Sequence, residues 1–401
     1  MKVNTARKID YFVGIPICFF FSIIENIKKH FFSKPIIKAL PKKIVFLELS
    51  EIGSAIFSFP LIKKVKEKYP NAEIYFWIFK ENSEVLSLFD FIPKNNIIFM
   101  RSRKILTLFI DVLKNIRKIR EEKIDTIIDL ELFSRFSSIL SYLSGAKVRV
   151  GFYRYKLEGL YRGNLHTHRI MYNPYFHISK NFIFAIDALE AYLGEAPLVK
   201  RPQEKNNHFL PKINISNQEK ENFWDKLKTV NSLLNRSSKI IIINFGFDNK
   251  ITIREWPVEY YLELTRRILE KQGMFIAFAG TGLVNTTSLL PKHERYINLV
   301  EKITIKELIC LFNISKVLIS HDSGIIHMAS LTDIHIIALF GPETPLLYGP
   351  LTKNKRVFYK SFTCSPCLSA YNHRNSICRN NKCMQAITVD EVYNEVIKII
   401  E

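Results

Sequence analysis

Residues 317–350 constrain the fold of this chain more than any other segment. An apolar run at 317–319 precedes the polar cluster SHDSG at 320–324, after which apolar residues recur at helical spacing. A second apolar run at 335–340 leads into the turn GPETP. Strand, polar turn, helix and strand in this order are typical of an α/β nucleotide site, where ligands bind beyond the carboxyl ends of parallel strands. The helix N-terminus also offers free N–H groups to a phosphate.

The same alternation of apolar strands and amphipathic helices runs through both halves of the chain. Strand patterns occur at 42–50, 72–79, 96–100, 125–130 and 146–152, and again at 239–246, 274–282, 317–319 and 335–340. Alternation of this kind predicts an α/β fold with parallel, doubly wound sheets. We therefore predict an N-terminal domain at 41–195, a polar, proline-containing linker at 196–212, a second domain at 213–385 and a closing helix at 386–401.

The polar turn and the following strand resemble the donor-site signature of the heptosyltransferase family, glycosyltransferase family 9. Members of this family show Asp-Thr/Ser-Gly-x-x-His, then a strand ending in Phe-Gly-Pro, then Thr and Pro. The residues that match in order and spacing are Asp322, Ser323, Gly324, His327, Phe340, Gly341, Pro342, Thr344 and Pro345. An ordinary strand-to-helix turn, in which Asp322 and Ser323 cap the helix, is the structural alternative. The resemblance implies a GT-B architecture, with two Rossmann-like domains and a cleft between them.

A sugar transferase must stabilise the negative charge that grows on the donor diphosphate as it leaves. Arg254 occupies the position of the family's Lys in a Lys-x-Trp-Pro element, although a surface ion pair with Glu255 or Glu259 would also explain it. Two strand ends and the helix N-terminus could contribute further. The remaining donor-site candidates are Asn244, Gly246, Gly280, Thr281, Gly282, Ser323 and Gly324. Cations and helix dipoles can neutralise a diphosphate, so we expect catalysis to require no cofactor.

The resemblance fails at the position where the family usually carries its general base. Members have Gly-Asp after the first strand, whereas this chain has SEIGSA with Ser54 in place of the Asp. A serine hydroxyl cannot accept a proton at neutral pH without a base of its own. Glu51 is the nearest carboxylate on the same turn, so we predict Glu51 and Ser54 as catalytic residues. The same substitution leaves open a catalytically silent relative that binds a nucleotide sugar in an envelope-glycan assembly.

The basic character of the chain favours an anionic partner. Its formal net charge is +20, although lysine-rich composition with solvated side chains would give the same value. Residues 153–174 lack a clear period and read as a loop, in which Arg154, Arg162, His166 and His168 could meet an anionic lipid-linked or polysaccharide acceptor. A solvated basic loop is the alternative. Nucleic acid is not expected, because no recognisable binding module accompanies the charge.

The N-terminal residues 1–40 combine basic and apolar character. The run at 11–24 is nearly all apolar and is flanked by lysines, but it is shorter than the ~20 residues of a spanning helix. Gly14 and Pro16 argue against one straight helix. We predict a peripheral or monotopic membrane-associating segment at the cytoplasmic face of the inner membrane. A hairpin packed on the protein's own surface is the alternative.

Four of the six cysteines form the pattern C-x2-C-x10-C-x4-C. They are Cys364, Cys367, Cys378 and Cys383. Two close thiolate pairs can build a tetrahedral structural zinc site, and free or redox-active thiols are the alternative. Nothing in the pattern suggests catalytic zinc.

These features predict an inverting glycosyltransferase of the envelope. It would move a sugar, with heptose implied by the resemblance, from a nucleotide-diphosphate sugar to lipopolysaccharide or another envelope glycan or lipid. A nucleotide-sugar epimerase or dehydrogenase is the competing enzyme class. Against that class, SEIGSA replaces the G-x-G-x-x-G that would follow the first strand.

Overall fold

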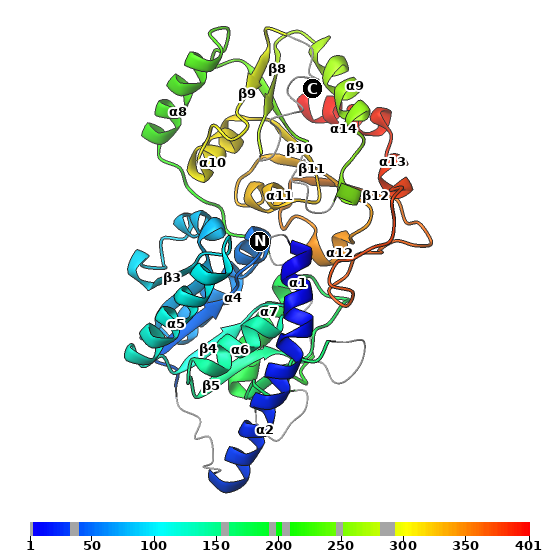
Figure 1. Cartoon of the computed structure of the whole chain (residues 1–401). Coiled ribbons are helices and arrows are strands. Elements are labelled where there is room, and N and C mark those ends of the chain that lie inside the picture. The colour runs from blue at the N-terminus through cyan, green and yellow to red at the C-terminus, as the bar shows by residue number, and fades with distance from the viewer. Residues whose placement is uncertain are drawn as a thin grey trace. The chain divides into compact units, whose positions relative to one another are not determined.

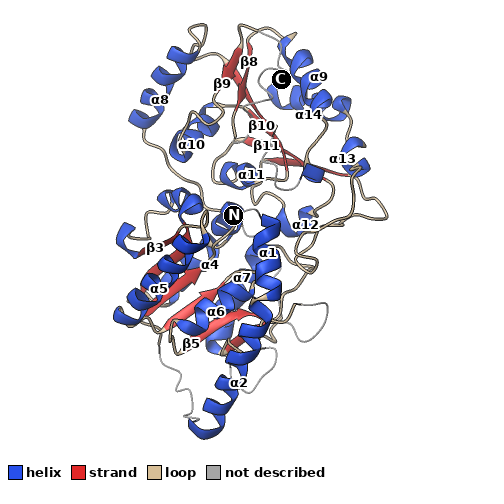
Figure 2. Ribbon diagram, in the orientation of Figure 1, coloured by secondary structure: helices blue, strands red, loops and turns tan. Residues whose placement is uncertain are grey.

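The computed structural model describes residues 3–32, 40–153, 160–191, 198–202, 209–245, 252–280 and 293–401. The chain divides into two compact units, residues 1–207 and 208–401. Each unit is built on a six-stranded parallel sheet with helices packed on it (Figures 1 and 2). The prediction of an α/β fold with two doubly wound sheets is therefore confirmed. The predicted linker at 196–212 lies partly outside the described residues.

The sheet of the first unit has the strand order β3-β2-β1-β4-β5-β6. Its strands are β1 (Lys43–Leu47), β2 (Glu73–Phe79), β3 (Ile97–Met100), β4 (Thr126–Asp129), β5 (Val148–Phe152) and β6 (His168–Ile170). The order changes direction between β1 and β4, whose register places Leu47 beside Asp129. Ligands of Rossmann-like sheets bind at this switch point, beyond the carboxyl ends of the strands.

The helices of the first unit form two groups. The helices α3 (Ile52–Phe57), α4 (Phe59–Lys68) and α7 (Ile178–Glu190) contact one another, and α5 (Ile105–Glu121) contacts α6 (Arg135–Leu143). Two short 3-10 segments, η1 (Lys80–Leu88) and η2 (Lys94–Asn96), lie between β2 and β3. The N-terminal helices α1 (Val3–Phe12) and α2 (Gly14–Phe32) pack against α6.

The second unit repeats the topology of the first, with the order β12-β11-β10-β7-β8-β9. Its strands are β7 (Lys239–Asn244), β8 (Met274–Phe278), β9 (Tyr296–Asn298), β10 (Val317–His321), β11 (His335–Phe340) and β12 (Lys355–Tyr359). Its helices are α8 (Asn217–Val230), α9 (Val258–Leu269), α10 (Ile305–Ile314), α11 (Gly324–Ala329), α12 (Pro345–Tyr348), α13 (Lys382–Gln385) and α14 (Val389–Ile400), with the 3-10 turn η3 (Thr252–Arg254) before α9. The switch point here lies between β7 and β10.

The closing helix α14 belongs to the core of the second unit. Thr388 and Glu391 form a capping box at its start, which satisfies two free N–H groups. Val392, Val396 and Ile400 recur every fourth residue and are buried against β7, β8 and α9. Burying an aliphatic side chain of this size contributes about 1.5–3 kcal/mol, so this stripe attaches the C-terminus firmly.

The apolar N-terminal segment is helical, and α1 and α2 are separated only by Val13, across which the N–H of Val13 donates to the carbonyl of Ile9 at 2.9 Å and the N–H of Ile17 to that of Val13 at 3.3 Å. Gly14 follows Val13, and a Cβ there would lie 2.7 Å from Cβ of Arg135, so the chain approaches α6 closely at this point. Among the described residues, Thr5–Phe31 is long and apolar enough to cross a membrane. That criterion rests on length and composition alone, and a signal sequence or a soluble core helix also meets it.

Candidate functional site

Polar side chains meet at the switch point of the second unit. Asn244 ends β7 and is buried, and its Nδ2 donates to Ser320 Oγ at 2.9 Å and to Ser323 Oγ at 3.1 Å. These bonds tie the end of β7 to the turn that follows β10. Gly280, just after β8, has a φ of +138° and approaches Asn244 so closely that a Cβ would lie 2.4 Å from Oδ1. Only glycine fits this position without strain.

The turn residues after β10 are held in place by main-chain and side-chain contacts. Ser323 precedes α11 in an extended conformation, and its side chain makes no cap hydrogen bond to that helix. The capping alternative is therefore wrong for Ser323, whose hydroxyl bonds Asn244 instead. Gly324 is the first residue of α11, and His327 lies buried on the same helix. Gly246, Thr281 and Gly282 lie outside the described residues.

Arg254 faces two buried carboxylates. It ends η3, and its Nη1 lies 3.4 Å from Asp322 Oδ2, while Nη2 lies 4.0 Å from Glu343 Oε2. Asp322 follows β10 directly, and its N–H donates to the carbonyl of Leu339 at 3.1 Å. Buried carboxylates require cationic partners, and the pairing in turn orients the guanidinium. Arg254 thus lies beside Asp322 at the end of β10, and its role in donor binding stays a prediction.

Glu343 and Arg374 belong to the same cluster and were missed from the sequence. The side chain of Glu343 is only 1% exposed, and Arg374 Nε lies 3.6 Å from its Oε2. The Arg374 guanidinium also lies over the ring of Tyr348, 4.8 Å from the centroid. The available sequence signal for Glu343 was its position between Pro342 and Thr344, inside the turn that resembles the family's. Arg374 gave none, because it comes from a distant loop.

Thr344 and Gly341 have local structural roles. Thr344 caps α12, because its hydroxyl accepts from the N–H of Leu346 at 3.3 Å. A Cβ on Gly341 would lie 2.7 Å from Sδ of Met384 and 2.9 Å from Sγ of Cys383. Close packing against α13 therefore explains this glycine without reference to a donor.

The C-terminal segment holds the turn that carries Arg254. Asn381 Nδ2 donates to the carbonyls of Ile253 at 3.1 Å and Glu255 at 2.8 Å. The indole N–H of Trp256 donates to the carbonyl of Ile387 at 2.9 Å. Both contacts join residues far apart in sequence, so the position of Arg254 depends on the folding of the last part of the chain.

The four clustered cysteines show no metal-binding arrangement in the structure. Cys364 is exposed, Cys367 and Cys378 are half-buried, and Cys383 is buried. Across the described part of the chain, which includes all four, no three His, Cys, Asp or Glu residues form a group that could hold a metal ion. The zinc site stays a prediction.

An acidic cluster occupies the switch point of the first unit. Glu48 directly follows β1, Glu51 precedes α3, and Glu131 follows β4, the neighbouring strand. Glu131 Oε1 accepts from the N–H groups of Leu49 at 2.8 Å and Ser50 at 3.0 Å. This contact holds the turn after β1 against the end of β4.

The predicted residues Ser54 and Glu51 lie together in this cluster. The hydroxyl of Ser54 donates to Glu51 Oε2 at 3.1 Å. The serine that replaces the family's aspartate is therefore hydrogen-bonded to the carboxylate proposed to substitute for it.

Burial at this switch point raises the pKa values of Glu48 and Glu131. Burial raises the pKa of Glu48 well above its usual value, and the nearby carboxyls of Glu131 and Glu51 raise it further. Burial also raises the pKa of Glu131 to about 7, although the hydrogen bond from Leu49 opposes the shift. Carboxyls with raised pKa values at strand ends are typical of acid–base sites. Glu131 could not be named from the sequence, because only the pairing of β1 with β4 brings it to this place.

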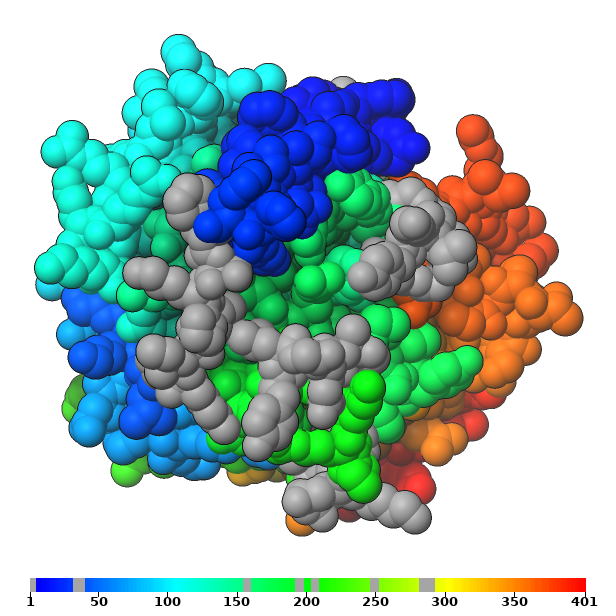
Figure 3. All heavy atoms as spheres, turned by 90° about the horizontal axis from the view of Figure 1, so that it is seen from below, coloured from blue at the N-terminus to red at the C-terminus, as the bar shows by residue number. Residues whose placement is uncertain are grey.

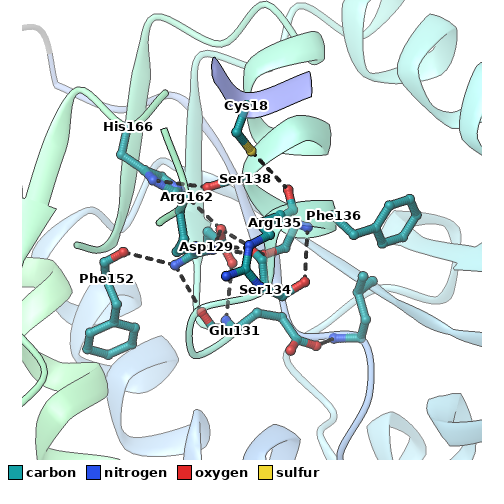
Figure 4. Close-up of polar contacts among 12 residues, drawn as sticks. Cys18, Asp129, Glu131, Ser134, Arg135, Phe136, Ser138, Phe152, Arg162 and His166 are labelled. Atoms are coloured by element: carbon teal, nitrogen blue, oxygen red, sulfur yellow. Dashed lines mark hydrogen bonds and ion pairs between the residues drawn. The ribbon is translucent and has the colours of Figure 1, made fainter. Parts of the chain in front are cut away.

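A buried network fixes the segment that carries Glu131 (Figure 4). Asp129 Oδ2 lies 2.5 Å from Arg162 Nη2 and 3.0 Å from His166 Nε2. Arg162 also donates to the carbonyls of Glu131, Ser134 and Phe152. Burial alone would raise the pKa of Asp129, but the Arg162 charge and the hydrogen bond from His166 outweigh it and hold that pKa below its usual value.

The acceptor-facing loop predicted from the sequence differs from the structure. Arg162, His166 and His168 are all buried, and the guanidinium of Arg162 is used by Asp129 and main-chain carbonyls. Burial, with the charge of Arg149, lowers the pKa of His168 to about 4. These buried side chains stabilise the edge of the sheet and are not placed to contact an acceptor directly. Arg154 lies outside the described residues.

The raised pKa values make stability depend on pH with a definite sign. On unfolding, Glu131 returns from about 7 to its usual 4.5, so the folded state binds more protons between these values. We expect the free energy of unfolding to fall as pH rises from about 4.5 through 7. Thermal unfolding from pH 5 to 8 measures this, and Glu131→Gln should flatten the dependence. An unchanged slope in the variant would contradict the raised pKa.

Two Rossmann-like units of this topology define a GT-B-like α/β fold. The sequence model of glycosyltransferase family 9 (heptosyltransferase) matches residues 112–377, more than half of the chain, and the chain belongs to this family. It is accordingly an enzyme of the glycosyltransferase class.

Characterised relatives agree with this assignment. The chain is 22% identical over 322 residues to the lipopolysaccharide core heptosyltransferase OpsX of Haemophilus influenzae, which covers 79% of this chain and 84% of that protein. The solved E. coli ADP-heptose LPS heptosyltransferase II matches with a TM-score of 0.67 at 18% identity, covering 89% of this chain and 98% of that one. E. coli heptosyltransferase WaaC with ADP matches with a TM-score of 0.63 at 14% identity, over 89% and 99%. At these identities the solved structures establish the fold alone.

Proposed function

We propose that the protein transfers a heptose from ADP-heptose to a lipopolysaccharide-type acceptor. The observation that carries this proposal is the pairing of Arg254 with Asp322 at the β7/β10 switch point of a family 9 chain. ADP-heptose and lipopolysaccharide are the compounds for which the similar proteins are named. The partly buried guanidinium supplies positive charge where the donor diphosphate would bind.

The chemistry we propose is a single displacement with inversion. The acceptor hydroxyl oxygen bonds to the anomeric carbon, the bond from that carbon to the diphosphate oxygen breaks, and ADP leaves with the electron pair. Arg254 stabilises the growing charge on the diphosphate. Asp322 and His327 hold the donor sugar and phosphate.

The proton of the acceptor hydroxyl passes to a carboxylate of the acidic cluster. Glu51 was expected from the sequence, and its hydrogen bond from Ser54 supports that role. Glu131 is the stronger candidate, because a base is most effective when its pKa lies near the working pH. Glu48, with its pKa raised well above the usual value, is suited to remain protonated beside it.

We place the enzyme at the cytoplasmic face of the inner membrane. The exposed apolar residues of α1 and α2, which include Phe12, Phe19, Phe20 and Phe31, support peripheral attachment there. An anionic lipid-linked acceptor would lie in the same membrane, and the net charge of +20 favours its approach.

A donor-binding experiment tests the nucleotide assignment. Thermal unfolding is followed with ADP-, GDP-, UDP- and CMP-linked sugars, and we expect selective stabilisation by ADP-heptose, because a ligand that binds only the folded state raises its stability. Asp322→Ala should lose the response, and Asp390→Ala, a change at an exposed aspartate on α14, should keep it. Stabilisation by a different nucleotide sugar would contradict the donor, and no response to any would contradict the site.

A catalytically silent relative remains the second candidate, since Ser54 stands where the family carries its base. It predicts donor binding without turnover. The transfer measurement at the end of the Discussion separates the two.

The cysteine cluster supports a separate proposal of a structural metal. Four thiolates at this spacing suit zinc. Elemental analysis of purified protein should give close to one metal per chain, and Cys364→Ser with Cys367→Ser should remove it. Metal-free protein that unfolds at the same temperature as the untreated protein would contradict a structural site.

A further inference from the structure

The N-terminal helices turn their acidic side chains toward the protein and expose large apolar side chains. Asp10 accepts from the N–H groups of Arg135 and Phe136, and Glu25 pairs with Arg149 at 3.2 Å. The opposite side exposes Phe12, Phe19, Phe20, Ile23, Ile27 and Phe31. Helices on the surface of a protein in water have the reverse arrangement.

An exposed stripe of helix α5 has the same inverted character, although the helix is remote in sequence and also buries Ile116 and Ile119 in the core. Asp111 and Asn115 are buried, where Asp111 pairs with Arg101 at 2.7 Å and Asn115 Nδ2 donates to the carbonyl of Phe99 at 2.7 Å. The outward stripe is apolar at Ile105, Leu106, Phe109, Ile110 and Leu113, each between 49% and 70% exposed. Water is a poor solvent for a stripe of this kind, so α5 requires an apolar neighbour.

Both inverted surfaces belong to the same side of the first unit. Helices α2 and α5 each pack against α6, and Figure 3 shows the blue N-terminal helices beside the cyan part of the chain along one edge. Between α2, α5 and α6 lies a cavity of about 410 Å³, whose lining includes the cations Lys28, Arg120 and Arg149, together with Glu25.

Basic side chains surround the α5 stripe. Arg103 and Lys104 precede it, and Lys114, Arg117 and Arg120 follow it, all of them exposed. An apolar stripe bordered by lysines and arginines suits an anionic phospholipid bilayer, with the apolar residues at the acyl boundary and the cations at the headgroups. A second copy of the chain fits less well, because two surfaces with the same positive charge repel each other.

We propose that α5 forms a second membrane contact, and that α1, α2 and α5 together dock the first unit on an anionic bilayer. This rests on the membrane association in the proposed function. Two separated contacts fix the orientation of the unit, whereas a single N-terminal anchor would leave it free to rotate.

A tryptophan reporter tests the contact at α5 itself. The native Trp77, Trp224 and Trp256 are buried, so a new exposed tryptophan reports separately. The full chain carrying Phe109→Trp is mixed with vesicles of phosphatidylethanolamine and phosphatidylglycerol with brominated acyl chains, which quench only indoles that reach them. We expect quenching and a blue shift for Phe109→Trp and for Phe20→Trp, and neither for Leu233→Trp, which replaces an exposed leucine of the other unit.

The outcomes distinguish the contact at α5 from the N-terminal membrane attachment on which it rests. Quenching of Phe20→Trp without quenching of Phe109→Trp would overturn the role of α5 and leave the N-terminal attachment standing. Quenching of neither would overturn the membrane association as well.

A binding measurement supplies a second test. Leu106→Gln with Phe109→Gln should weaken partitioning into the same vesicles at least about tenfold, since two apolar side chains lose their burial. Leu233→Gln is the matched control and should bind like the unchanged protein. The unchanged protein could instead be a dimer without lipid. If the double variant is then monomeric and binds vesicles normally, a second copy of the chain covers the stripe and the proposal is wrong.

Discussion

Replacing Arg254 by alanine is expected to lower kcat/KM for ADP-heptose by about 10²–10³-fold, the usual cost of removing a preorganised group that stabilises leaving-group charge. The guanidinium lies 3.4 Å from Asp322 Oδ2 and within 4.0 Å of Glu343 Oε2, so it is held in place before the donor binds. Because the charge develops as the bond breaks, kcat should fall more than donor affinity. Steady-state kinetics with calorimetric donor binding measures both.

Two variants control for this result. Arg254→Lys keeps the charge but loses the planar fork, and we expect it to recover only part of the activity. Arg266→Ala removes an exposed arginine of α9 whose partners are Glu263 and Glu270, and should leave the kinetics unchanged. An Arg254→Ala enzyme with normal kcat would contradict the role of Arg254 at the diphosphate.

Glu131→Gln is expected to lower kcat by about 10²–10⁴-fold, the usual contribution of a general base. The amide keeps an oxygen that can accept from Leu49 and Ser50 but cannot take a proton, so the fold should be preserved. In the unchanged enzyme the base is active when deprotonated, and kcat should rise with pH through about 7. The variant should lose this rise while binding the donor normally.

Glu51→Gln is the matched comparison on the same turn. If Glu131 is the base, Glu51→Gln should retain the rise in kcat near pH 7 and lose activity only modestly. The reverse pattern, with a normal pH profile in Glu131→Gln and loss of activity in Glu51→Gln, would return the role to the residue expected from the sequence.

The fold was accessible from the sequence because its signals are local. Each buried strand, such as KIIIIN or HIIALF, is a short apolar run, and the alternation of such runs with helices predicts parallel sheets. Asn244, Gly280, Arg254 and Asp322 could be named for the same reason, since each lies at the end of a strand or beside a recognisable motif.

The remaining parts of the site depend on long-range pairing. Glu131 reaches the turn after β1 only because β4 pairs with β1, and Arg374 reaches Glu343 from a loop with no regular pattern. Arg162 and His166 were misjudged for the opposite reason. A basic segment without a helical or strand periodicity looks like a solvated loop. In the structure, however, both side chains are buried and pair with Asp129 on β4.

Transfer of heptose is the measurement that tests the account most directly. Purified protein is incubated with ADP-heptose and with lipopolysaccharide from cells that lack this protein. The lipopolysaccharide is then analysed by mass spectrometry. We predict the addition of one heptose with stoichiometric release of ADP, and both rates about 10²–10³-fold lower in Arg254→Ala. Tight binding of ADP-heptose with no heptose added to any lipopolysaccharide would contradict the proposed transfer and identify a silent relative.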